Sequence, residues 1–174
     1  MSKNFKELLG TVNTFIFDVD GVLTDGSVTL MPDGEQVRKM NIKDGYALQL
    51  AIKQGYRVAI ISGGKSEAIR TRMNGLGITD VFLGVSNKLE KLDDYLMATD
   101  SSINQVLYMG DDLPDYEVMY KVGVAVCPRD AAPEIISLCS YVSHFKGGEG
   151  CVRDVIEQTM RLHSKWFDKN GFVW

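Results

Sequence analysis

Cysteine is scarce in this chain, and its spacing excludes two classes of small protein. Only Cys127, Cys139 and Cys151 occur among the 174 residues, and no Cys-x-x-Cys pair is present. Neither a zinc ribbon nor a disulfide framework is therefore expected. We expect free, buried thiols in a reducing compartment.

Long apolar runs and an excess of one charge are also missing. No segment reaches the roughly 18 consecutive apolar residues that span a bilayer, and the N-terminal residues lack the apolar core of a signal peptide. Nineteen basic and 23 acidic side chains give a net charge of −4, which argues against a nucleic-acid partner or an anionic membrane surface. We expect a cytoplasmic globular protein with one domain over residues 1–174.

Short apolar runs alternate with segments of helical period. The pattern predicts buried strands at 13–18, 56–62, 80–84, 105–110 and 124–127, and an edge strand at 141–143. It predicts helices at 43–55, 66–77, 87–99, 115–123 and 149–167. Such alternation implies right-handed crossovers and an α/β fold: a mainly parallel sheet with helices on both faces.

One segment breaks the alternation. Residues 26–41 form two short alternating runs around Pro32-Asp33-Gly34, which predicts a β-hairpin flap after the first strand. No insertion is long enough for a separate cap domain, and the chain closes with an aromatic-rich tail at about 165–174.

Polar residues gather where the predicted strands end. Asp18 and Asp20 follow the first strand, Ser62 the second, and Asp111 with Asp112 follow the strand at 105–110. Ligands of parallel α/β sheets bind beyond the carboxyl ends of the strands, so these residues are expected to meet in one site.

The spacing of Asp18 and Asp20 raises an electrostatic question. Alternation along a strand would place both carboxylates on one face, where they repel each other. A cation, a shared proton or both must offset that cost. With Asp111 they form an oxygen-only set without His or Cys, which suits a hard cation such as Mg²⁺. Asp112 and Asp115 can be ordinary helix caps. For Asp115, a cap or a supporting role behind the site and direct ligation of the metal stay equally open.

Two further segments suit a phosphate group. "ISGGKSE" places Ser62 and Gly63 at a strand end before a helix, where a hydroxyl and backbone N–H groups can cradle an anion. Lys88 in "NKLEKL" opens another helix at the same edge. Taken alone, these features are no more than a turn, a cap and a solvated lysine.

Together the residues suit phosphoryl transfer through an aspartyl-phosphate. Asp18 would attack phosphorus. Asp20, with a pKa raised by the neighbouring carboxylate, would protonate the leaving oxygen and later take a proton from the hydrolytic water.

The segments "DVDGVLTDG", "ISGG", "NKLEKL" and "GDDLPD" resemble the four motifs of haloacid-dehalogenase-type phosphatases. The resemblance covers nearly the whole chain. With "DGEQVRKMNIKDG" and "KGGEGCVRDV", it extends to the capless branch of 3-deoxy-D-manno-octulosonate 8-phosphate phosphatases.

The resemblance implies a Rossmann-like three-layer sandwich and a role for each matching residue. Asp18 corresponds to the nucleophile, Asp20 to the acid/base, and Ser62 and Lys88 to the phosphate-binding residues. The metal ligands correspond to Asp18, the backbone carbonyl of Asp20, and Asp111, with Mg²⁺ as cofactor. The chain departs from the family at Lys146, where arginine often precedes "GGEG", and lysine lacks the two-pronged grip of arginine on a carboxylate.

The implied substrate is a phosphorylated 3-deoxy-2-keto sugar acid, with eight carbons favoured and nine carbons left open. Arg70, Arg72 and Lys146 are basic residues that could meet the substrate carboxylate, Arg72 foremost. Most arginines on helices simply face solvent, and that alternative stays open for Arg70 and Arg72.

Three other interpretations of the motifs fit the sequence less well. An EF-hand loop fits poorly because the glycine in "DVDGVLTD" stands at the fourth position. A phosphoacceptor signalling module shares the acidic cluster and the lysine, but a second carboxylate poised as acid/base would discharge its acyl phosphate. A catalytically idle scaffold does not explain the full set of residues.

The resemblance also implies a homotetramer in which hairpins associate. Val28, Leu30, Val37 and Met40 of the hairpin would be poorly covered in a monomer. The tail contributes Trp166, Phe167, Phe172 and Trp174, either packed on its own chain or as a lid over a neighbour's site.

Overall fold

One parallel sheet forms the middle layer of the computed structural model, which describes residues 4–167 and 169–172. Its strands stand in the order β5-β4-β1-β6-β7-β8, and every neighbouring pair is parallel. The strands are β1 (Thr14–Phe17), β4 (Arg57–Ile61), β5 (Asp80–Phe82), β6 (Val106–Met109), β7 (Val124–Cys127) and β8 (Tyr141–Val142). The predicted parallel sheet, with 141–142 at its edge, is confirmed.

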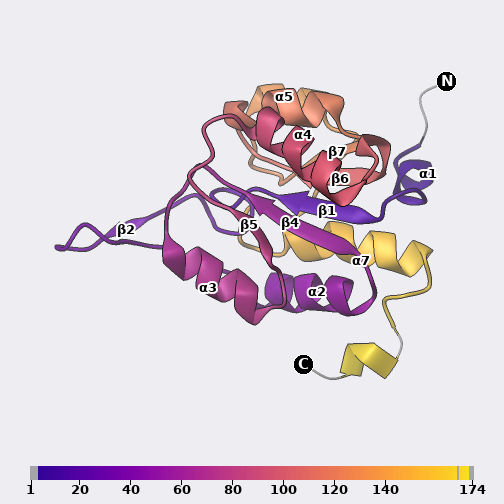
Figure 1. Ribbon diagram of the computed structural model, residues 1–174, viewed down its shortest axis with the longest axis horizontal. Coiled ribbons are helices and arrows are strands. Elements are labelled where there is room, and N and C mark those ends of the chain that lie inside the picture. Colours follow the sequence, from indigo (N-terminus) through magenta and orange to yellow (C-terminus); the bar gives the residue numbers. More distant parts are fainter. Residues whose placement is uncertain (1–3, 168, 173–174) are drawn as a thin grey trace.

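Helices cover both faces of this sheet (Figure 1). The α-helices are α1 (Phe5–Leu9), α2 (Ile42–Lys53), α3 (Glu67–Gly75), α4 (Lys88–Thr99), α5 (Tyr116–Lys121), α6 (Pro133–Leu138) and α7 (Cys151–Leu162). Short 3₁₀ turns are η1 (Ile103–Gln105), η2 (Leu113–Asp115) and η3 (Lys169–Phe172). Helices α2, α3 and α7 lie on one face, and α4 and α5 lie on the other (Figure 1).

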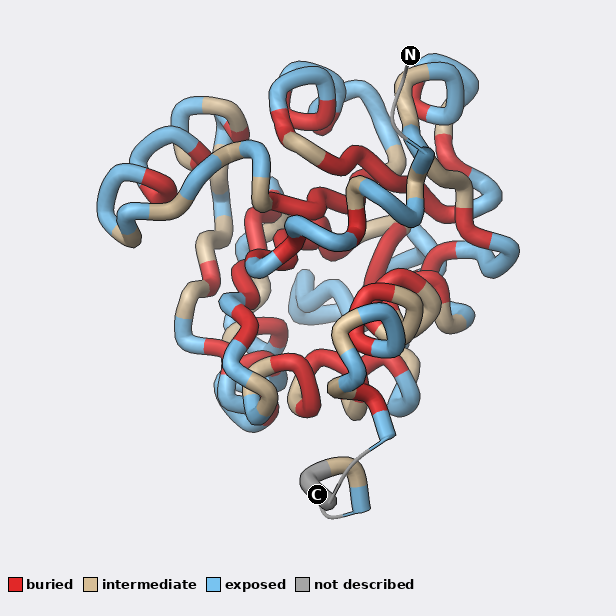
Figure 2. Tube along the Cα trace, turned by 90° about the vertical axis from the view of Figure 1, so that its right-hand side faces the viewer, coloured by how far each residue is buried: buried red, intermediate tan, exposed pale blue. Residues whose placement is uncertain are grey.

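Alternation along the strands divides the core into two parts. In β1, Phe15 and Phe17 face the cluster that includes α2, α3 and α7, whereas Ile16 faces the cluster built with α4, α5 and α6. Both sides of the strand are therefore apolar, as expected for a sheet covered on both faces. Figure 2 shows the buried residues along the central strands and the exposed residues on the outer turns of the helices.

Two helices were not predicted, and the closing helix is shorter than predicted. Helices α1 and α6 were not predicted, because five and six residues are too few to show a helical period. The closing helix was predicted over 149–167 but spans Cys151–Leu162. It stops early because Ser164 adopts a left-handed conformation with φ of 58°, which an α-helix cannot continue.

The predicted hairpin is present and projects from the body of the protein (Figure 1). Its strands β2 (Thr29–Leu30) and β3 (Gln36–Val37) pair antiparallel, and the Met31 amide donates to the Glu35 carbonyl at 2.9 Å. Val28, Leu30 and Val37 are exposed, as predicted. Met40 is not, because the chain has by then turned back and packs it against the α2 side of the core. The described residues contain no cap domain.

Two asparagine caps fix where the helices near the sheet edge begin. Asn41 accepts from the Lys43 amide at 2.8 Å and starts α2, and Asn87 accepts from the Glu90 amide at 3.1 Å and starts α4. Because α4 begins directly after Asn87, Lys88 is held in its first turn, beside the carboxyl ends of the strands.

The C-terminal segment divides into a packed part and an exposed part. Trp166 is buried and meets the ring of Tyr46 edge to face, with 6.4 Å between centroids. Phe167 and Phe172 are exposed and contact each other. For Trp166, packing on its own chain is thus the correct alternative, whereas Trp174 lies outside the described residues. Within the described chain, no helix is both long and apolar enough to cross a membrane.

Candidate active site

The carboxyl ends of three adjacent strands meet at one cavity of about 540 Å³. Asp18 follows β1, Ser62 follows β4 and Asp111 follows β6, and β1 stands between the other two. Asp20 and Gly63 also line the cavity. The predicted meeting of these distant segments is therefore observed.

Asp18 and Asp20 lie at the same cavity for a different reason from the strand alternation that was predicted. The strand ends at Phe17, and the amides of Leu23 and Thr24 fold back onto the Val19 carbonyl at 2.9 and 3.1 Å. Strand alternation therefore does not apply at Asp20. A tight turn brings both carboxylates to the cavity instead.

Glycine is required at the top of that turn. Gly21 has a φ of 81°, and a Cβ there would lie 2.0 Å from a carboxylate oxygen of Asp111. Any side chain at Gly21 would be strained and would collide with the acidic group. The DxDG motif thus lets the β1 loop and the β6 loop touch.

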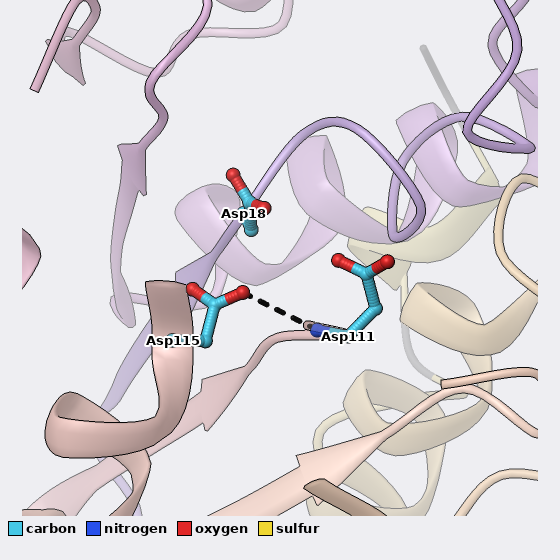
Figure 3. Close-up of side chains that lie close together, drawn as sticks. All are labelled: Asp18, Asp111 and Asp115. Carbon is cyan, nitrogen blue, oxygen red and sulfur yellow. Dashed lines mark hydrogen bonds between the residues drawn. The ribbon is translucent and has the colours of Figure 1, made fainter. Parts of the chain in front are cut away.

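Three carboxylates converge in the cavity: Asp18, Asp111 and Asp115, each with an oxygen within 4.8 Å of the others (Figure 3). The Lys88 ammonium lies 3.0 Å from Asp18 and 2.7 Å from Asp115. This arrangement places one cation against three carboxylates.

Asp115 is fixed behind the other two acidic residues. Its Oδ1 also accepts from the Tyr108 hydroxyl at 2.6 Å, and its Oδ2 accepts from the Asp111 amide at 3.3 Å (Figure 3). It makes no side-chain cap bond to α5, so the cap interpretation is wrong for Asp115. For Asp112 it is correct, because that carboxylate accepts from the Leu113 amide at 2.8 Å.

The cluster changes the pKa values of its members. Burial, and then repulsion from Asp115, raises the pKa of Asp18 to about 6, although Lys88 opposes the rise. Burial, and then repulsion from Asp18 and Asp115, raises the pKa of Asp111 to about 7. Burial acts to lower the pKa of Lys88, but its two carboxylate partners outweigh burial and raise it.

These residues fit a divalent cation. The donors are all oxygens, which hard cations prefer, and the one lysine does not balance the three carboxylates. Repulsion among the carboxylates adds to burial in raising the pKa values of Asp18 and Asp111, and a cation beside these two residues would relieve that repulsion.

Ser62 follows β4, on the other side of β1 from β6 and Asp111, and lines the same cavity. Its hydroxyl oxygen accepts from the Gly64 amide at 3.2 Å, which leaves the hydroxyl proton available to an anion. The cradle is not part of a helix, since α3 starts only at Glu67. The cradle is therefore a loop next to Lys88.

The basic residues predicted to meet a carboxylate lie outside the cavity lining. Arg72 packs its guanidinium against α2 at Gly45 and lines a neighbouring groove beside the hairpin. Arg70 donates to the Val81 carbonyl at 2.6 Å. Lys146 is exposed, although the next residue, Gly147, packs against the Gly21 carbonyl.

Two residues of the site were missed by the sequence reasoning. Tyr108 could have been noticed, because it is the only side chain with a hydroxyl group in the otherwise apolar strand β6. No feature of the sequence marks Arg38 as a residue of the site. It comes from the hairpin and grips Asp20 through two hydrogen bonds, Nε to Oδ1 at 2.6 Å and Nη2 to Oδ2 at 3.1 Å.

Comparison with known proteins identifies the family of this chain. Residues 77–155 match the model of a haloacid dehalogenase-like hydrolase. The 3-deoxy-D-manno-octulosonate 8-phosphate phosphatase of Salmonella typhi is 38% identical over 160 residues, which cover 92% of this chain and 85% of that protein.

Solved structures agree with this result. The phosphatase of the same name from Yersinia pestis superposes with a TM-score of 0.91 at 34% identity, covering 95% of this chain and 89% of that one. The Moraxella catarrhalis phosphatase, solved with magnesium, phosphate and KDO, gives a TM-score of 0.88 at 27% identity and 91% coverage of both chains. This chain therefore belongs to the haloacid dehalogenase-like hydrolases, in the capless branch of its relatives, and is a phosphoric monoester hydrolase.

Proposed function

We propose that this enzyme hydrolyses 3-deoxy-D-manno-octulosonate 8-phosphate to the free sugar acid and phosphate, with Mg²⁺ as cofactor. The observation that carries the substrate is the identity of 38% to a phosphatase of that name over 92% of the chain. The magnesium, phosphate and KDO bound to the Moraxella catarrhalis relative support both the metal and the sugar acid.

The metal would be held by Asp18, Asp111 and the backbone carbonyl of Asp20, with Asp115 fixing Lys88 and the Asp111 loop behind them. When bound, Mg²⁺ supplies positive charge that balances the carboxylates and the phosphate oxygens. The bond changes and proton transfers described next are carried out by side chains of the protein.

The first half-reaction forms a bond and breaks a bond at phosphorus. A carboxylate oxygen of Asp18 attacks, the bond from phosphorus to the sugar oxygen breaks, and a proton from Asp20 passes to that oxygen. Ser62 and Lys88 bind the oxygens of the transferring group from the side of the cavity. The product is an aspartyl-phosphate on Asp18 and the free sugar acid.

The second half-reaction restores the enzyme. Water attacks phosphorus, Asp20 as carboxylate takes the proton of that water, and the bond from phosphorus to the Asp18 oxygen breaks. Asp20 is then protonated again. The presence of Asp20 in the cavity favours an enzyme over a phosphoacceptor module, because the acyl phosphate of such a module must persist and a base beside it would promote its hydrolysis.

A substrate comparison tests the proposal. With Mg²⁺, kcat/KM for the eight-carbon keto-acid phosphate should exceed that for the nine-carbon analogue and for glucose 6-phosphate by at least about 10-fold each. Chelation should stop turnover, and Mg²⁺ should restore it. Equal kcat/KM for the sugar acid and the neutral hexose phosphate would refute the substrate, and activity that survives complete metal removal would refute the metal site.

The homotetramer and the cytoplasmic location stay predictions. The exposed apolar residues of the hairpin, among them Val28, Leu30 and Val37, support association of copies through that element. The exposed Phe167 and Phe172 leave the proposal of a tail lid over a neighbouring copy open.

A further inference from the structure

Arg38 joins the hairpin to the residue proposed as acid/base. It follows β3 directly, and its guanidinium spans both carboxylate oxygens of Asp20, 18 residues earlier in the chain. Two more bonds tie the guanidinium to its own strand, to the Gln36 carbonyl at 3.0 Å and to the Gln36 side-chain oxygen at 3.3 Å. Arg38 is therefore held at the hairpin and at the site together.

This pair differs from the surface ion pairs of the same chain. The Arg38 side chain is 9% exposed and Asp20 is 39% exposed, whereas Arg70 and Glu67 are 37% and 74% exposed. Exposed pairs add little because water and salt screen them, but a two-pronged pair is directional, and here its arginine is largely covered. The contact is thus able to fix where the Asp20 carboxylate points.

The two roles proposed for Asp20, acid and then base, differ in how the carboxyl group can contact Arg38. A guanidinium fork binds a carboxylate through both oxygens, whereas a protonated carboxyl group has one oxygen occupied by its own proton. The carboxylate form is the one that takes a proton from water in the second half-reaction. The observed two-pronged contact fixes the orientation of both Asp20 oxygens as acceptors, which is the orientation that a base for the second half-reaction needs.

We propose that Arg38 is a positioning residue that holds Asp20 as the base for hydrolysis of the aspartyl-phosphate, and so makes this step depend on the hairpin. The inference rests on the proposed function. Arg38 also lines the groove between the hairpin and α3, next to Gly64 at the rim of the catalytic cavity. A displaced hairpin would withdraw Arg38 from Asp20 and leave the base unsupported.

A leaving group that needs no acid separates the two half-reactions. With p-nitrophenyl phosphate and Mg²⁺, rapid mixing measures p-nitrophenolate release in the first turnover, and the steady state reports hydrolysis. In Arg38→Gln the first turnover should stay within about 2-fold of wild type while the steady state falls about 10-fold, so that phosphoenzyme accumulates. Arg38→Lys should be intermediate, because a point charge cannot span both oxygens. Lys39→Gln, which removes an exposed neighbouring charge from the hairpin, should behave as wild type.

A double-mutant cycle decides whether Arg38 acts through Asp20. In an Asp20→Asn background, Arg38→Gln should change the steady-state rate by less than about 2-fold. An equal loss in both backgrounds, or an equal slowing of both phases in the single variant, would overturn the proposal, because Arg38 would then act on the substrate or on the fold. If Arg38→Gln does not fold, Arg38→Lys carries the same test. Wild type without any turnover would instead refute the proposed function.

Discussion

Lys88 is the side chain on which the charge balance of the site depends most. It is 6% exposed and contacts two carboxylates whose own burial is nearly complete, Asp18 and Asp115. Removing one partner of a buried pair leaves the other charges uncompensated, which costs more than the pair itself contributes. The lysine therefore stabilises the fold as well as binding the transferring phosphoryl group.

Lys88→Met should lower the free energy of unfolding by about 3 kcal/mol in the absence of metal. Mg²⁺ should raise the Tm of this variant more than that of wild type, because the metal then supplies the positive charge beside Asp18 that Lys88 no longer provides. Lys91→Met, on the same helix and with an exposed ion pair to Asp94, is the matched control and should stay within about 0.5 kcal/mol of wild type. Equal stability of the two variants would show that Lys88 does not compensate the cluster.

At the scale of elements, a single carboxylate couples α2 to α7. Asp44 lies in the first turn of α2, is 1% exposed, and accepts from the Arg153 amide in the first turn of α7 at 2.7 Å. Its other oxygen, Oδ2, is buried without a hydrogen-bond partner. Burial raises the pKa of Asp44 to about 6, although the α7 amides oppose the rise.

A raised pKa in the folded state makes the protein lose stability as pH rises. Asp44 in the folded chain binds its proton up to about pH 6, whereas its ordinary value is 3.8, so this contribution is present at pH 4 and lost by pH 7. Asp44→Asn keeps an acceptor for the α7 amide and cannot ionise. Denaturant unfolding should show the variant gaining on wild type between pH 4 and 7, by about 3 kcal/mol at most. A difference that does not change with pH would contradict this.

The elements that carry the site could be predicted because their signals are local. Buried strands that end in Asp18, Ser62 and Asp111 show both the apolar run and the polar stop, and parallel sheets bring such ends together. Arg38 could not be predicted in the same way. Its direction depends on how far the hairpin leans over the β1 loop, which is a tertiary distance that no local pattern records. The same holds for Arg72, whose helix faces α2 rather than the cavity.

At the scale of the whole molecule, the hairpin is the element with the least cover. Leu30 is 72% exposed on β2, which projects from the body of the protein (Figure 1). Exposed apolar strands of this kind mark contacts between chains. The proposed homotetramer would cover it.

Leu30→Asp should shift the assembly to smaller species without changing the circular dichroism spectrum. Light scattering during gel filtration measures the mass. Met97→Asp, at an 85% exposed position on α4, is the control and should leave the assembly unchanged. A wild-type protein that is monomeric and fully active at assay concentration would refute the tetramer.

Covalent transfer to Asp18 is most directly tested by locating the phosphoryl group in the Asp20→Asn protein. After reaction with p-nitrophenyl phosphate and Mg²⁺, acid quenching and peptide mass spectrometry should find one phosphoryl group on the peptide that contains Asp18, and none in Asp18→Asn. Under the same conditions wild type should release many phosphates per chain, because Asp20 completes the second step. Phosphate on another residue, or undiminished turnover by Asp18→Asn, would contradict the mechanism.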